Sequence, residues 1–366
     1  MRKKGLTALL FAACVTAAAS CQTKGGKAAA TETDPAKVTE EVPVQKVDID
    51  KTDSQGRLKD GQHWTDGFAS YVVEKRGDCF FFFGGTTHEG GYTFGLQPQN
   101  DGSYRVKESN WSMIEDKEAT EPKEEGYVSL NGAGQLLNAR HCRLAGEELL
   151  VVSNEGGQAT DVLVLYDGEL SNRIVYEKRL ILAGKYQQLD GNGELKFTND
   201  GKVLMPGETK PVPFAFEPDG NDLYCDVFKV NGRYYGFMMT EDGLELYETN
   251  KNADEGNYEQ GRLVGKYKKT ASADNPNSSW PYGFTSHTVL TTGMLESFSV
   301  SMLRLIRNEI WARHGYVFAD AELAKRFSSR RDYKPADDNN AIELSPLEQV
   351  NVSLLRSEEL RRNKFE

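Results

Sequence analysis

Residues 305–318 read Leu305-Ile306-Arg307-Asn308-Glu309-Ile310-Trp311-Ala312-Arg313-His314-Gly315-Tyr316-Val317-Phe318. Leu303, Ile306 and Ile310 recur at the spacing of one buried helix face, which predicts a helix over residues 299–314. Gly315 follows at the position where helices commonly end in a left-handed residue. His314 therefore falls in the last turn, where the helix dipole stabilises a protonated imidazole.

Two further helix starts follow this stretch. Asp320 is suited to cap a second helix, with Leu323 and Phe327 facing inward. Ser345-Pro346-Leu347-Glu348 combines a capping box with proline at the first helical position, which predicts the start of a third helix. We expect residues 296–366 to form a small three-helix module.

The predicted helix over residues 299–314 carries the candidate site. Arg307, Trp311 and His314 share one helix face, because their spacings of four and seven residues bring them nearly into line. They are the candidate ligand-binding residues, with a cation–π contact expected between Arg307 and Trp311. Glu309 and His314 point about 140° apart, so we expect no catalytic pair there and assign no catalytic residue. Glu309 and Arg313 are four residues apart and predict a salt bridge.

A structural interpretation of the same residues is open. Arg307 and Asn308 can cap neighbouring helices or bond loop carbonyls. The Glu309–Arg313 pair can be internal to the module, and His314 can serve only the chain reversal at Gly315.

The stretch resembles the signature of the YARHG family, a small module of bacterial exported proteins. Asn308, Glu309, Arg313, Gly315 and Tyr316 match the motif, whereas Trp311 replaces the usual tyrosine and Arg331-Asp332 stands where a tryptophan often precedes Tyr333. The resemblance continues through Tyr333-Lys334-Pro335 and the late pattern from Leu344 to Glu358. It implies an exported or surface lipoprotein with a binding role at the cell envelope and no established reaction.

The N-terminus predicts export. Arg2, Lys3 and Lys4 precede an apolar or small-residue run over 6–19, which is too short to span a bilayer and has the layout of a secretory signal. Ala18-Ala19-Ser20-Cys21 resembles a relaxed bacterial lipobox of the kind seen in Bacteroidetes lipoproteins, and implies that Cys21 is lipidated. An ordinary signal cut after Ala19 or Ser20 is the alternative. Residues 21–57 have few large apolar side chains and predict a flexible tether.

Charge and cysteine content exclude several classes of function. Loss of residues 1–20 removes three positive charges and no negative one, so the net charge moves from −11 to −14. An acidic chain of this kind argues against a nucleic-acid partner. Cys79, Cys142 and Cys225 lack metal-binding spacing, so we expect no metal site and no cofactor. They can form one disulfide or remain small buried side chains.

The region from 58 to 270 is predicted to be all-β and antiparallel. Asp-Gly and Asn-Gly pairs recur along it, among them Asp101-Gly102 and Asn231-Gly232, and such pairs favour tight hairpins. A barrel, a sandwich or a propeller fits this pattern. The predicted strand segments are Ser70–Glu74, Cys79–Phe83, Leu149–Ser153, Val162–Tyr166, Arg173–Tyr176, Leu223–Val230, Arg233–Met239 and Leu244–Glu248.

The predicted class is therefore α+β, an all-β body followed by the helical module. We divide the body into 58–179 and 180–270, the second part weakly resembling lipocalin-like β-domains. One continuous β domain over 58–270 is the alternative. Residues 271–295 are rich in Pro, Gly, Ser, Thr and Asn and predict a linker.

Three functions are compatible with these features. The first is a lipid-anchored envelope protein, most simply at the outer membrane, that binds or scaffolds a cell-wall or envelope-protein partner without catalysis. The alternative is an envelope hydrolase with its site between the β body and the helical module. The third, a structural subunit of an envelope complex, predicts an exposed apolar patch.

Overall fold

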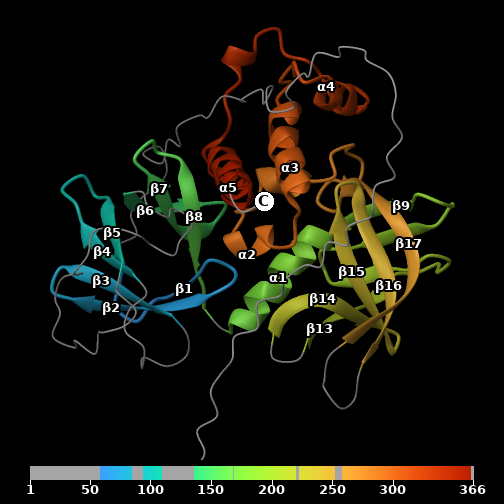
Figure 1. The fold of residues 1–366 in the computed structure, drawn as a ribbon, viewed down its shortest axis with the longest axis horizontal. Helices are drawn as coiled ribbons and strands as arrows, with labels where there is room; N and C mark the ends of the chain where they lie inside the picture. Colours follow the sequence, from blue (N-terminus) through green and yellow to red (C-terminus); the bar gives the residue numbers. More distant parts are fainter. Residues whose placement is uncertain are drawn as a thin grey trace, which may run out of the picture. The chain divides into compact units, whose positions relative to one another are not determined.

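The computed structural model describes residues 58–84, 94–108, 136–167, 169–219, 222–251 and 258–363 (Figure 1). Within these ranges the chain forms a closed antiparallel barrel of eight strands, a second antiparallel sheet of nine strands, and helices concentrated toward the C-terminus. The predicted α+β class is confirmed, and the first β unit takes the barrel form.

In the barrel, each strand pairs with its sequence neighbour, and the first strand closes the ring against the eighth. Its interior is packed with aromatic and branched side chains, including Trp64 and the stacked rings of Phe82 and Phe94, whose centroids lie 4.5 Å apart. The strands are β1 (His63–Thr65), β2 (Ser70–Arg76), β3 (Cys79–Gly84), β4 (Phe94–Pro98), β5 (Tyr104–Glu108), β6 (Leu137–Leu144), β7 (Glu147–Asn154) and β8 (Ala159–Leu165).

Strands β7 and β8 are buried on both faces. Leu150 and Leu163 belong to the barrel interior, whereas Leu149, Val151 and Val164 belong to a core shared with the helices and the second sheet. Since successive side chains of a strand point to opposite faces, one wall of the barrel also forms a packing surface for the helices.

The second sheet is antiparallel, and the strands that come first and last along the chain, β9 and β17, pair with each other in its middle. A tight turn at Asn231 and Gly232, with φ of 49° and 77°, joins β14 to β15 as the Asn-Gly signal predicts. In sheet order the strands are β12 (Val212–Pro213), β11 (Lys202–Leu204), β10 (Glu194–Phe197), β9 (Gly184–Gln188), β17 (Tyr258–Ser272), β16 (Gly243–Lys251), β15 (Arg233–Thr240), β14 (Asp222–Val230) and β13 (Ala215–Asp219).

One predicted strand is wrong. Arg173–Tyr176 lies in helix α1 (Leu170–Leu182), between the barrel and the second sheet in sequence, so the body is not all-β. Ile174, Ile181 and Leu182 face inward at helical spacing, but Glu177 and Lys178 are buried beside them and obscure the apolar pattern. The other predicted segments fall in β2, β3, β7, β8, β14, β15 and β16.

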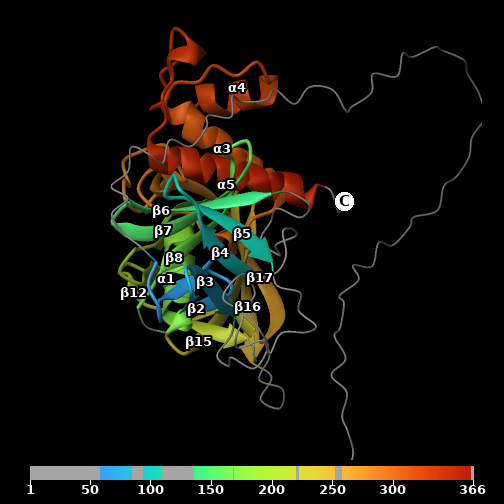
Figure 2. The same cartoon turned by 90° about the vertical axis from the view of Figure 1, so that its left-hand side faces the viewer.

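The C-terminal helices start and end where local signals predict. Asp320 Oδ1 accepts from the amides of Glu322 and Leu323, and Ser345 with Glu348 forms the capping box. Helix α5 runs beside α3, as Figure 2 shows. The elements are η3 (Gly283–Ser286), α2 (Thr292–Leu295), α3 (Val300–Arg313), α4 (Ala321–Ser328), η4 (Asn339–Ala341) and α5 (Pro346–Arg362).

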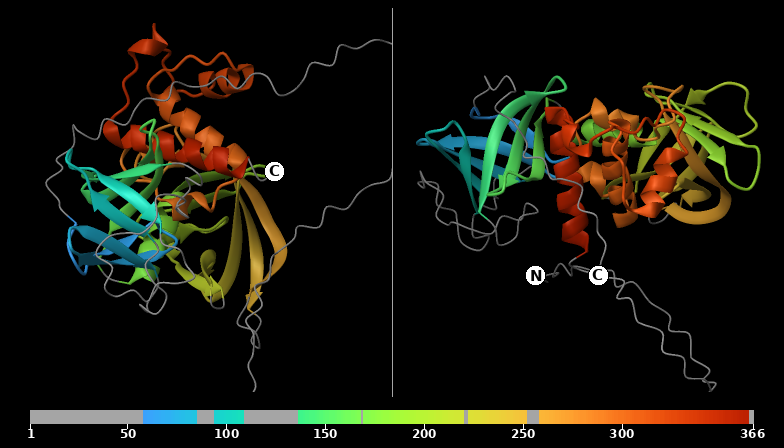
Figure 3. Two further views of the ribbon diagram at one scale, coloured as in Figure 1. Left: turned by 60° about the vertical axis from the view of Figure 1, so that its left-hand side comes forward. Right: turned by 90° about the horizontal axis from the view of Figure 1, so that it is seen from above.

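Residues 271–295 differ from the predicted linker. Trp280, Tyr282, Phe284, Leu290 and Leu295 are buried in the core shared by the helices and both β units. Figure 3 shows this segment and α2 among the other helices. The prolines and glycines of the segment serve turns within packed structure, so its composition resembles that of a linker although its side chains are buried.

In the described part of the chain, no helix is long and apolar enough to cross a membrane. Cys79 and Cys142 are buried. Cys21 and the predicted signal and tether lie outside the described residues, as does the side chain of Cys225.

Candidate functional site

Helix α3 is fixed at both ends by the local sequence. Ser299 Oγ accepts from the amide of Met302 at 3.3 Å, and Gly315 reverses the chain with a φ of 86°. The amide of Gly315 bonds to the carbonyl of Ala312, and that of Tyr316 to the carbonyl of Trp311. The predicted helix and its termination at Gly315 are confirmed. The side chains of the motif are therefore attached to a helix with both ends fixed.

Arg307 faces the interior rather than solvent. Its Nε lies 2.6 Å from Glu359 Oε1 and its Nη2 3.0 Å from Glu359 Oε2, and the residue is 5% exposed. Two parallel hydrogen bonds of this kind are the bidentate geometry in which a guanidinium binds a carboxylate strongly. Arg307 therefore joins α3 to α5, and it pairs with Glu359 instead of making the predicted contact with Trp311.

Trp311 is a core residue. It is 1% exposed, and its ring meets that of Tyr316 edge-on with centroids 5.6 Å apart. Tyr316 in turn packs on Phe318 at 5.0 Å. The indole N–H has no hydrogen-bond partner among the described residues. The Arg307–Trp311–His314 face predicted as a ligand surface is thus interior at two of its three positions.

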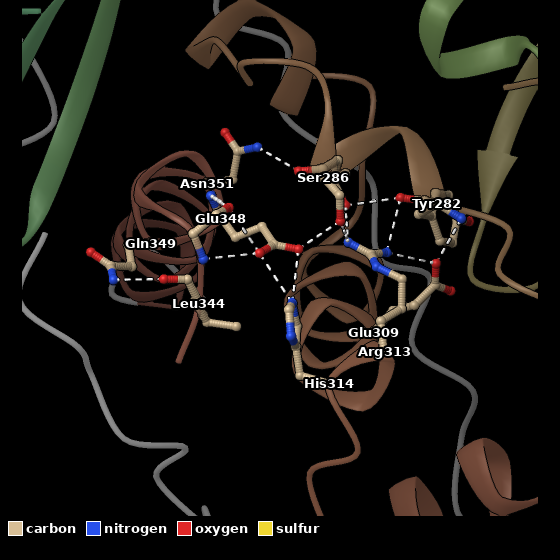
Figure 4. Close-up of polar contacts among 11 residues, drawn as sticks. Tyr282, Ser286, Glu309, Arg313, His314, Leu344, Glu348, Gln349 and Asn351 are labelled. Carbon is tan, nitrogen blue, oxygen red and sulfur yellow. Dashed lines mark hydrogen bonds and ion pairs between the residues drawn. The ribbon is translucent and has the colours of Figure 1, made fainter. Parts of the chain in front are cut away.

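His314 is the exception, with 34% of its side chain exposed. Its Nε2 lies 3.0 Å from Glu348 Oε1 and 3.1 Å from Glu348 Oε2 (Figure 4). The end of α3 is therefore tied to the first turn of α5. Glu348 was not among the predicted site residues, although it belongs both to the capping box and to the late part of the YARHG pattern.

Glu348 collects donors from three parts of the module. Ser286 Oγ donates to Oε1 at 2.6 Å, and the Ser345 amide and hydroxyl donate to Oε2 at 3.1 and 2.9 Å. Burial alone would raise the pKa of Glu348, but hydrogen bonds from His314 and Ser286 outweigh it and hold the pKa at about 2. The group is a carboxylate throughout the physiological range.

The predicted Glu309–Arg313 salt bridge is present, with 3.2 Å between Arg313 Nη1 and Glu309 Oε1. Arg313 also donates to the carbonyl of Tyr282 and to the hydroxyls of Thr285 and Ser286, while the Tyr282 amide donates to Glu309 (Figure 4). Burial raises the pKa of Glu309 against the opposing charge of Arg313, and burial lowers the pKa of Arg313. This pair anchors the turn at 282–286 to α3.

Two asparagines complete the network. Asn308 donates to the carbonyl of Arg304 at 2.8 Å, and its Oδ1 has no partner among the described residues. Asn351 donates to the carbonyls of Thr285 and Thr288 and accepts from the amide of Leu290 at 2.9 Å. Asn351 therefore ties α5 to residues 285–290 by three bonds to the main chain.

The arrangement is suited to holding structure rather than to acyl transfer. Hydrolysis by a serine nucleophile needs the hydroxyl on the histidine and the histidine on the carboxylate. Here Ser286 and His314 both bond to Glu348, so the Ser286 hydroxyl donates its hydrogen bond to the carboxylate and not to the imidazole. In the described ranges, no group of three or more His, Cys, Asp and Glu side chains is placed to hold a metal ion.

Basic side chains after α3 contact the second sheet and the segment that follows it. Arg326 Nη1 lies 2.9 Å from Glu241 Oε1, and its Nη2 lies 3.1 Å from Asp242 Oδ1, both in the turn between β15 and β16. Arg330 donates to the carbonyl of Ser279 at 3.0 Å. These cations face the protein's own acidic and carbonyl groups.

Comparison with curated proteins gave no match for this chain, and comparison with solved structures gave none either. A match to a protein family covers residues 281–359. It spans the network described above, from the turn that Arg313 anchors to Glu359, the partner of Arg307. The matching family is the YARHG domain, and the C-terminal region of this chain is accordingly a YARHG domain.

Proposed function

We propose that this protein is an envelope lipoprotein, anchored to the outer membrane through Cys21, in which the YARHG domain is a non-catalytic scaffold. In this proposal the domain holds the barrel and the second sheet in a fixed arrangement. The β units then present the surface that meets a cell-wall or envelope-protein partner.

The contacts of the YARHG domain with both β units carry the proposal. Ser357 Oγ on α5 donates to the carbonyl of Ala159 in β8 at 2.8 Å. On the other side, Arg326 at α4 pairs with Glu241 and Asp242 of the second sheet. A domain that contacts both β units can transmit its own stability to each of them.

The chemistry of the motif supports the same proposal. The charged groups of Arg307, Glu309, Arg313 and Glu348 are paired inside the domain. Paired and buried charges of this kind hold the elements that carry them in one arrangement. They leave little of the motif to contact a substrate, and this favours a scaffold over the hydrolase alternative.

Hydrogen exchange on the full chain tests the scaffold role. In the Arg307→Ala variant, we expect faster amide exchange in β8 and β17 as well as in α3 and α5, because all four elements share one core. The matched control is Arg262→Ala, which removes an exposed pair with Glu248 and should leave exchange unchanged. Faster exchange confined to α3 and α5 would count against the scaffold role.

Cell fractionation tests the anchor. We expect the wild-type chain in the membrane fraction with incorporated palmitate, and the Cys21→Ser variant in the soluble fraction without it. Cys14→Ser is the matched control, since Cys14 lies within the predicted signal and should not affect anchoring. Equal membrane association of all three chains, with no lipid on Cys21, would rule out the lipoprotein assignment.

A further inference from the structure

The second sheet has one side turned away from the shared core. Strands β14, β15, β16 and β17 are neighbours in this sheet (Figure 1), and Phe228, Phe237 and Leu246 point from them into the core. Because successive side chains of a strand alternate, the residues between these point to the other side. That other side, which we call the tyrosine face, comprises Tyr234, Gly236, Met238, Tyr247, Tyr258 and Leu263.

Apolar surface on this face is exposed around Tyr247. Gly236 of β15 is opposite Tyr247, and Tyr247 is opposite Leu263 of β17. Met238 is 53% exposed and Leu263 is 40% exposed, so both strands that flank the ring present apolar side chains to water. Gly236 adds no bulk between them, and a Cβ there would lie 2.9 Å from Thr249 Oγ1. Exposed apolar side chains gathered in this way are typical of a binding surface.

The rings of the other two tyrosines are held in place by their neighbours. The centroids of Tyr234 and Tyr258 lie 5.3 Å apart. Lys229 Nζ lies 4.9 Å from the centroid of Tyr234, and Lys251 Nζ lies 5.2 Å from that of Tyr258. The Tyr258 hydroxyl also donates to Glu217 Oε2 at 3.2 Å. Side chains that are ordered before a ligand arrives lose less conformational entropy when it binds.

The charges beside the tyrosines nearly cancel. Among the described contacts, the charged side chains that touch the tyrosines directly or through Glu245 are Lys229, Lys251, Lys266, Glu217 and Glu245. Lys266 pairs with Glu245 at 2.5 Å, and hydrogen bonds from Lys266 and Tyr247 lower the pKa of that carboxyl, which is therefore an ionised acceptor. Nearly balanced charges, on a chain of net charge −11, favour an uncharged ligand over a polyanion.

We propose that the tyrosine face binds an uncharged glycan chain of the cell wall. This inference rests on the proposed function, whose cell-wall partner it identifies. A sugar ring presents C–H groups on its faces, which pack on Tyr247, Met238 and Leu263. Its hydroxyl groups bond to the carboxylates and lysines beside the rings, and tyrosine suits this role because it joins a rigid apolar ring to a polar end.

The size of the face favours a glycan over a protein partner. A stable protein interface buries about 800 Å² on each partner. The exposed apolar part of the face, Met238 and Leu263 beside one ring, lies between charged groups and is small by comparison. A sugar chain needs only the rings and polar groups directly beneath it.

Titration of the full chain with chitohexaose, a soluble uncharged chain of N-acetylglucosamine, tests the tyrosine face. The unlipidated Cys21→Ser variant serves as the parent, so that the anchor plays no part. We expect saturable binding that does not change with salt, because an uncharged ligand releases no counterions. Tyr247→Ala should weaken it at least about tenfold. Tyr247→Phe keeps the ring and should stay within about threefold of the parent.

Two further variants complete the titration. Leu263→Asn, at an exposed position on the face, should weaken binding in the same direction as Tyr247→Ala. Tyr176→Ala is the matched control, because Tyr176 is 45% exposed but lies on α1 against Arg173, and this variant should bind like the parent. An equal loss in Tyr176→Ala and Tyr247→Ala, or affinity that falls steeply with salt, would overturn the proposal.

Retention on purified cell-wall sacculi separates this inference from the proposed function. Equal retention of the parent and Tyr247→Ala would overturn the tyrosine face but leave the cell-wall partner in place. If neither sacculi nor chitohexaose bind the parent, both the face and a cell-wall partner are wrong. Retention that requires added envelope proteins would assign the partner to a protein and would likewise overturn the glycan.

Discussion

Arg307 and Glu359 lie 52 residues apart in sequence, yet two hydrogen bonds of 2.6 and 3.0 Å join their side chains inside the YARHG domain. The pair fixes α3 against α5. We expect Arg307→Ala to destabilise the full chain by about 3–5 kcal/mol, because Glu359 then remains buried without its cation. Denaturant unfolding measures the loss.

The double variant Arg307→Met, Glu359→Met is the control for this pair. Because it removes both charges and keeps apolar volume, we expect a much smaller loss than in the single variant. If Arg307→Ala lies within about 1 kcal/mol of the wild type, the pair does not fix the two helices.

The second prediction concerns acid stability through Glu348. Its folded-state pKa of about 2 is below the ordinary 4.5, so its contribution is complete above pH 4.5 and is lost as the pH falls from 4.5 toward 2. We expect Glu348→Gln to be less stable than wild type at pH 6 and to lose part of the fall in stability over this acid window. Unfolding measured in steps from pH 6 to pH 2 checks this.

His314→Gln provides a graded version of the same test. Removing the imidazole takes away one of the donors that lower the pKa of Glu348, so acid unfolding should begin at a higher pH than in wild type. Glu322→Gln, at an exposed position on α4, is the control. Identical acid profiles for wild type, Glu348→Gln and His314→Gln would contradict the assigned role of the carboxylate.

The third prediction tests the contact between α4 and the second sheet. Arg326→Glu places a negative charge beside Glu241 and Asp242 and should cost about 1 kcal/mol, since the partners are largely exposed. Faster amide exchange in α4 should accompany the loss. Adding Glu241→Arg should restore much of the stability, and failure of this rescue would show that the charges do not hold α4.

Local signals explain which elements the sequence predicts. The ends of α3, α4 and α5 depend on Gly315, Asp320 and Ser345, each of which acts within a few residues of its own position. Helix α1 was missed because buried Glu177 and Lys178 interrupt its apolar face. Glu177 pairs with Arg173 on the same helix, but its second partner Thr291 and the Lys178 partner Asp226 are distant in sequence. Much of the pairing that permits their burial is therefore not visible in the segment itself.

The same distinction applies to the candidate site. The Glu309–Arg313 salt bridge was predictable because two side chains four positions apart on one helix lie close together. The sequence favours Arg307 as a ligand residue because its partner Glu359 lies on another helix, and the register between two helices is set by packing. The sequence also favours Trp311 as a ligand residue although it is buried, since helical spacing alone does not distinguish a buried aromatic face from an exposed one.

The last prediction concerns the end of α3. Gly315 has a φ of 86°, and a Cβ there would lie 2.4 Å from the Lys334 carbonyl and 2.9 Å from the Ala336 amide. We expect Gly315→Ala to combine the backbone strain of about 1–2 kcal/mol with this steric conflict, and to disturb the bond between the Ala336 amide and the Gly315 carbonyl. Denaturant unfolding of the full chain measures the total loss.

Gly61→Ala separates the two contributions. Gly61 also has a positive φ, 74°, but a Cβ there meets no atom within 4 Å, so this variant should show the backbone strain alone. The difference between the two losses then reports the cost of pushing residues 334–336 away from the end of α3. Equal losses would mean that these residues yield freely, and that the glycine is required only for its backbone conformation.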